Sequence, residues 1–129
     1  MIQERKIDVL IAETTTWKQL IQELENENIF FKTRLATVLS TGRHGLPIEQ
    51  FEHFQNRFLK MDSQLTVLRH EVREQLKQLE SAAQSHETAE VLSVLLQEQL
   101  GKRMTVLESS FEILLHDFSM YLSENFPGS

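Results

Sequence analysis

The chain has 129 residues, and its 13 basic and 19 acidic side chains give it a formal net charge of −6. This charge argues against nucleic-acid binding and membrane-surface binding, because both need basic surfaces that the composition does not supply. The absence of cysteine excludes disulfides, thiol catalysis and thiolate metal sites. The length suits one domain, which we expect to span residues 1–129.

The first segment, roughly residues 6–40, has apolar residues at alternating steps of three and four from Ile7 to Val38. This repeat is typical of a long amphipathic helix. The run Thr14–Thr16 is β-branched and therefore a poor helix interior, and its last threonine with Gln19 resembles a capping box. A short separate helix before Trp17 is the alternative, but the unbroken repeat favours one continuous helix.

The second segment, roughly residues 47–82, repeats the same spacing from Phe51 to Leu79. It follows a break at residues 41–47, where two glycines and Pro47 are typical of a turn that leads into a helix. A softer break follows at residues 81–87. Short connections between long helices make neighbours antiparallel, so we expect this helix to run against the first.

The third segment, roughly residues 86–124, is less regular. A seven-residue repeat covers Leu100–Tyr121, but its backward extension falls on Gln97 and Ser93. The apolar residues there are Leu92 and Leu96, one position away. That spacing predicts a stutter, which unwinds a coiled coil locally.

Gly101 lies beside the predicted stutter, and a glycine inside a helix costs about 1 kcal/mol relative to alanine. We therefore expect a bend near Gly101. Taken together, the three segments predict an all-α protein, an antiparallel bundle of about three long helices.

Aromatic side chains in the repeats should share levels of such a bundle. Matching residues around the two connections places Phe31, Phe54, Phe58 and Phe111 near one level. Aromatic residues in a helical stripe are usually core. An apolar ligand cavity between the helices is the alternative.

Polar residues also occupy the repeats, and buried polar groups must find partners. Such a residue often fixes the register of a bundle at some cost in stability. A polar ligand pocket is the sharper interpretation. The matching brings Thr14, Gln75 and Ser93 to a similar height, and it brings Asn28 near the height of Ser110.

The five histidines raise the question of a metal site. Di-iron bundles use a Glu-x-x-His step on facing helices, and the sequence has none. His53, His70 and His116 fall on outward positions, whereas His44 and His86 fall in the connections. No hydrolase elbow, phosphate loop or metalloprotease step is present. We therefore expect no enzyme activity, no cofactor and no metal.

The third segment has more apolar residues than a three-helix core requires. A second stripe with seven-residue spacing lies beside the first, and further leucines lie on the other side of the seam. An exposed stripe favours association, and a two-fold homodimer is the simplest symmetric cover. The competing interpretation is that the third helix is central and wrapped by the other two. The candidate interface consists of Val106, Ile113, Met120, Leu115, Leu122 and Phe30.

The sequence therefore favours a non-enzymatic helical-bundle protein that acts through protein–protein contact, of an adaptor or small regulatory type. The alternative is a small-molecule or metal-binding bundle that uses the aromatic layers. The stretch Ile7–Ala12 is too short and too polar for a signal peptide, and no run approaches the ~20 apolar residues of a membrane span. We expect a cytoplasmic protein.

Overall fold

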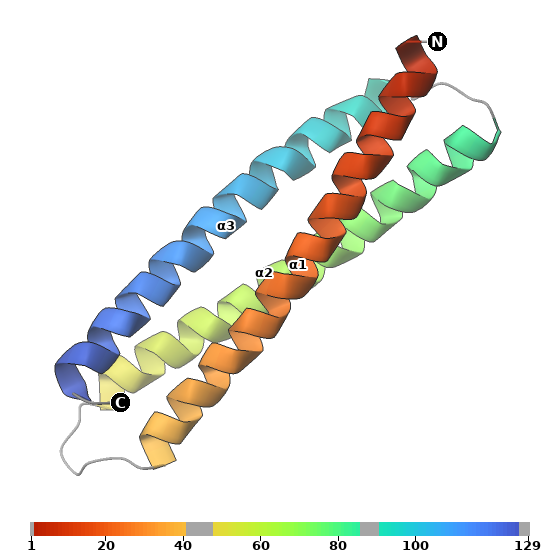
Figure 1. Cartoon of the computed structure of the whole chain (residues 1–129). Coiled ribbons are helices and arrows are strands. Elements are labelled where there is room, and N and C mark those ends of the chain that lie inside the picture. Colours follow the sequence, from red (N-terminus) through yellow and green to blue (C-terminus); the bar gives the residue numbers. More distant parts are fainter. Residues whose placement is uncertain (1, 41–47, 86–90, 127–129) are drawn as a thin grey trace.

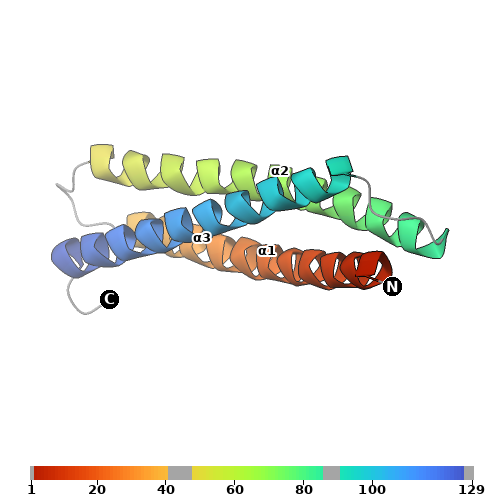
Figure 2. The ribbon, with the colours of Figure 1, turned by 90° about the horizontal axis from the view of Figure 1, so that it is seen from above.

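The computed structural model describes residues 2–40, 48–85 and 91–126, and it contains three long helices. They are α1 (Ile2–Ser40), α2 (Ile48–Gln84) and α3 (Val91–Asn125). Figure 1 shows α2 running against α1 and α3, with the two chain ends at opposite ends of the bundle. The view in Figure 2 shows that the helices do not lie in one plane, so that a core forms between them. The predicted antiparallel all-α bundle is confirmed. The predicted break at 41–47 lies outside the described residues. Of the predicted break at 81–87, residues 81–84 still belong to α2, whereas 86 and 87 lie outside the described residues.

α1 is continuous across Thr14–Thr16, as the heptad repeat favoured. Each of the three threonine hydroxyls donates a hydrogen bond to the carbonyl oxygen four residues earlier, at 2.6, 2.8 and 3.0 Å. These bonds satisfy the hydroxyls within the helix. A β-branched run therefore does not interrupt α1.

The seven-residue repeat of α3 continues further towards its start than the sequence predicted. Gln97 is 4% exposed and Leu96 is 38% exposed, so the buried line runs from Leu100 back to Gln97. The predicted stutter is wrong. Gln97 is buried in place of Leu96 because its side chain forms hydrogen bonds with polar groups in the core. The bundle therefore gains little from turning Leu96 inward.

Gly101 lies within the uninterrupted α3, which Figure 1 shows as one rod without a sharp kink. A Cβ added at Gly101 would lie 3.4 Å from Cζ2 and 3.7 Å from Cη2 of Trp17. The missing side chain lets the indole of α1 lie directly against the backbone of α3. The indole therefore leaves room for a methyl group at this position, but not for a larger side chain.

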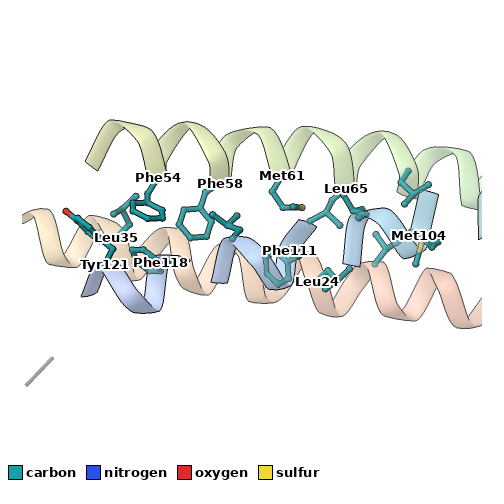
Figure 3. Packing of buried hydrophobic residues seen from close by; sticks show 14 of the residues in the cluster. Leu24, Leu35, Phe54, Phe58, Met61, Leu65, Met104, Phe111, Phe118 and Tyr121 are labelled. Carbon is teal, nitrogen blue, oxygen red and sulfur yellow. The ribbon is translucent and has the colours of Figure 1, made fainter. Parts of the chain in front are cut away.

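An aromatic cluster centred on Phe118 fills the core where α1 ends and α2 begins (Figure 3). The Phe118 ring centroid lies 5.2 Å from that of Phe58, 5.5 Å from Phe54 and 6.3 Å from Phe31. Phe118, and not Phe111, thus shares their level. The predicted layer was displaced by one heptad, because matching around a connection cannot tell how many residues the connection itself uses. Phe111 is buried one layer further along, opposite Met61 in Figure 3.

Replacement of Phe118 by alanine should lower the free energy of unfolding by about 3–5 kcal/mol, because it opens a cavity among four other rings. Denaturant unfolding followed by circular dichroism measures this loss. Phe30→Ala is the matched control, since Phe30 is 64% exposed. Equal losses in the two variants would contradict the central position of Phe118.

Replacement of Gly101 by alanine should raise stability by up to about 1 kcal/mol, because alanine favours the helix and its methyl group meets Trp17 at an ordinary contact distance. Gly101→Leu should instead displace the indole and destabilise the fold. Trp17 is the only tryptophan, so its fluorescence reports the displacement directly. Destabilisation by Gly101→Ala without any change in fluorescence would show that Trp17 does not limit this site.

Candidate interaction surface

An outer stripe of three apolar side chains runs along α3. Val106 is 64% exposed, Ile113 is 58% exposed and Met120 is 48% exposed. Their seven-residue spacing places them on one face of the helix, beside the buried repeat. The exposure predicted for these three residues is confirmed, and "outer stripe" denotes them below.

The other candidate interface residues lie elsewhere. Leu115 and Leu122 are partly buried and pack against the core cluster. They follow Gly101 at multiples of seven residues, and Gly101 contacts Trp17, so this side of α3 faces α1. Phe30 is exposed on α1, where its ring meets that of Phe31 edge-on at 5.1 Å. Of the candidate interface residues, Val106, Ile113 and Met120 therefore lie together on one exposed face. Leu115 and Leu122 pack against the core instead.

The second interpretation of α3, that both other helices wrap it, holds for part of its circumference. α1 covers the side of Gly101 and Leu115, and α2 packs along the next side. Within the described residues, the outer stripe is covered by neither helix. The surplus of apolar residues in α3 is therefore partly core and partly surface.

A basic groove of about 440 Å³ lies between α2 and α3 at the Val106 end of the outer stripe. Its exposed apolar residues are Val106 of α3 and Val67 of α2. Val67 is 51% exposed. Its charged lining residues are Lys102 and Arg103. Arg103 also forms an ion pair with Glu71 of α2. This end of the stripe is therefore both apolar and positively charged.

An acidic groove of about 400 Å³ lies between the start of α2 and the end of α3, at the Met120 end of the stripe. Its lining includes the carboxylates of Glu49, Asp117 and Glu124, together with His53 and Tyr121. Burial raises the pKa of the Tyr121 phenol, which keeps it protonated and neutral. The two ends of the outer stripe thus carry opposite charge.

Ion pairs link α2 to both of the other helices. Arg57 of α2 contacts Asp117 of α3 at 2.9 Å, and its guanidinium also lies 5.7 Å from the ring centroid of Phe54. On the other side of α2, Arg69 contacts Glu25 of α1 at 2.6 Å. The side chains are partly exposed, so each pair adds only modest stability.

A polar layer of Thr14, Gln75 and Gln97 links all three helices inside the bundle. Gln75 Nε2 donates to Gln97 Oε1 at 3.0 Å and to the carbonyl oxygen of Ser93 at 3.0 Å. Gln97 Nε2 donates to Thr14 Oγ1 at 2.9 Å and to Glu13 Oε1 at 2.8 Å. The predicted group of Thr14, Gln75 and Ser93 is confirmed. The sequence missed Gln97, whose position in the repeat was the available signal.

A second polar contact in the core is made by Asn28, which the sequence placed at a height near that of Ser110. Asn28 does not pair with Ser110 but turns to α2, where its Nδ2 donates to Asp62 Oδ1 at 2.6 Å and to the carbonyl oxygen of Phe58 at 3.2 Å. Asp62 also forms an ion pair with Lys32 of α1. The physical reason is that a charged acceptor on α2 is a stronger partner for the buried amide than a serine hydroxyl.

Metal chemistry finds no support in the described part of the chain, where no three His, Asp or Glu side chains gather in a way that could hold an ion. His53, His70 and His116 are exposed, as the repeat predicted. Within the same residues, no helix is both long and apolar enough to cross a membrane.

Comparisons with known protein families, with curated proteins and with solved structures find no match to this chain.

Replacement of Gln97 by alanine should cost about 1–3 kcal/mol of stability, because Gln75 Nε2 and Thr14 Oγ1 would each lose one of their two buried hydrogen bonds. Urea unfolding measures this cost. Gln99→Ala is the matched control, since Gln99 is exposed two positions away on the same helix. If both variants unfold at the same urea concentration, the polar layer does not contribute to stability.

Proposed function

We propose that this chain is a non-enzymatic helical-bundle protein that acts through protein–protein contact, and that it forms a homodimer through the outer stripe of α3. The observation that carries the proposal is the alignment of Val106, Ile113 and Met120 on one face, each about half exposed or more. Exposed apolar side chains that repeat along one face of a helix favour association with another apolar surface. The broader role is that of an adaptor or small regulatory protein.

The buried polar side chains support a non-enzymatic role, because they form hydrogen bonds with one another and stabilise the bundle. Gln75 and Gln97 bond to each other inside the bundle, and Asn28 bonds to Asp62. The aromatic rings around Phe118 contact one another, as rings do in a filled core. A cytoplasmic location is part of the proposal, because a chain without cysteine suits a reducing compartment.

The outer stripe is sufficient for a weak dimer. Full burial of a valine, isoleucine or methionine side chain is worth about 1.5–3 kcal/mol, so a half-exposed one gains about half of that. Two copies together bury six such side chains and gain roughly 5–9 kcal/mol before other terms. Association costs at least about 4 kcal/mol in lost translational and rotational freedom. The remaining gain of about 1–5 kcal/mol corresponds to a dissociation constant of roughly 0.2 mM or weaker for the stripe alone. We therefore expect a weak dimer that needs high protein concentrations or contacts beyond the stripe.

Ile113→Lys should abolish the dimer and leave the monomer folded, because it places a charge in the middle of an apolar contact while the side chain itself stays outside the core. Sedimentation velocity over a series of concentrations measures the change, and circular dichroism checks the fold. Val9→Lys is the matched control, because Val9 is 62% exposed on α1.

Two results would contradict the proposal. One is an unmodified chain that stays monomeric throughout the concentration series. The other is an Ile113→Lys variant that dimerises as well as Val9→Lys. Unfolding of Ile113→Lys would show instead that Ile113 belongs to the interior.

A further inference from the structure

We propose that the two copies pair with their α3 helices antiparallel and centred on Ile113, so that the basic groove of each copy receives Met120 of the other. This inference rests on the proposed homodimer and adds its geometry and the source of its specificity. The spacing of the outer stripe is the first argument. Val106 and Met120 each lie seven residues from Ile113, so a two-fold axis at Ile113 sets Val106 of one copy against Met120 of the other.

Charge decides between the antiparallel and the parallel pair. The groove at the Val106 end is lined by Lys102 and Arg103, and the groove at the Met120 end is lined by Glu49, Asp117 and Glu124. An antiparallel pair brings the basic groove of each copy to the acidic groove of the other. A parallel pair sets like charges against like charges, which disfavours association.

The charges that act across the interface are those not already used within one copy. Arg103 pairs with Glu71, and Asp117 pairs with Arg57. Lys102, Glu49 and Glu124 form no ion pair within the described residues. One free basic group therefore lies at one end of the stripe, and two free carboxylates lie at the other. The two-fold axis repeats this complementarity at both ends.

The area needed for a stable dimer brings α2 into the contact. The stretch from Lys102 to Glu124 is about 33 Å long and a helix is about 10 Å wide, so α3 alone offers a footprint of about 330 Å². A standard interface buries about 800 Å² on each partner. The basic groove extends the contact onto α2, because Val67 forms its far wall. Methionine suits such an irregular groove, since its side chain is flexible and unbranched.

Single-cysteine variants test the pairing directly, because the chain has no cysteine of its own. The variants are Ile113→Cys, Val106→Cys and Met120→Cys, treated with a short bismaleimide cross-linker at concentrations where sedimentation detects the dimer. Ile113→Cys should cross-link to itself. Val106→Cys and Met120→Cys should each cross-link poorly alone and severalfold better when mixed, giving a mixed dimer that mass spectrometry identifies. Val9→Cys on α1 measures cross-linking by random collision.

Charge reversal gives an independent readout. Lys102→Glu should weaken the dimer, because it places like charges at both ends of the antiparallel pair. The double variant Lys102→Glu with Glu124→Lys should regain most of the lost affinity, since opposite charges meet again. A parallel pair would respond differently, because Lys102 would face its own copy and the double variant would restore nothing.

The outcomes separate this inference from the proposed function. A dimer in which Val106→Cys and Met120→Cys each cross-link to themselves, with no gain on mixing, overturns the antiparallel pairing and leaves the homodimer intact. A dimer whose three variants cross-link no better than Val9→Cys overturns the α3 interface. A chain that sediments only as a monomer overturns both.

Discussion

The register of the three helices depends on one buried amide. Gln97 of α3 accepts a hydrogen bond from Gln75 of α2 and donates to Thr14 and Glu13 of α1. A buried amide left without partners costs more than its bonds gain, so a shift of any helix by one turn is penalised at this layer. Apolar contacts alone tolerate such shifts far better, because leucine and methionine side chains are interchangeable at similar volume.

Fixing the register also fixes what α3 presents to solvent. With Gln97 buried, the heptad places Gly101 and Leu115 towards α1, and it leaves Val106, Ile113 and Met120 on the opposite flank. The stutter expected from Leu96 would have rotated the first turns of α3 relative to the rest. The polar layer and the outer stripe are thus two consequences of one helix orientation, although they lie on different sides of α3.

The sequence predicted the helices well because an unbroken heptad repeat constrains a chain at every turn. It predicted contacts between helices poorly, because these depend on offsets that the connections set. Phe118 rather than Phe111 shares a level with Phe58, and the sequence did not identify Asp62 as the partner of Asn28. Gln97 was set aside in favour of Leu96, since hydropathy ranks each residue alone and ignores polar partners on other helices. The exposure of the outer stripe could be predicted without knowing how the helices are offset from one another, because it follows from the periodicity of α3 alone.

The same distinction applies to the proposed surface. Its apolar part follows from periodicity, but its charges come from different helices: Glu49 of α2 reaches the acidic groove beside Glu124 of α3 only because the bundle brings those two ends together. Apolar burial supplies most of the free energy of such a contact without selecting an orientation. Charge supplies little net free energy, yet like charges opposite each other are costly, and this is what selects one orientation. A short apolar stripe with opposite charges at its ends therefore yields a weak, reversible contact with one defined orientation.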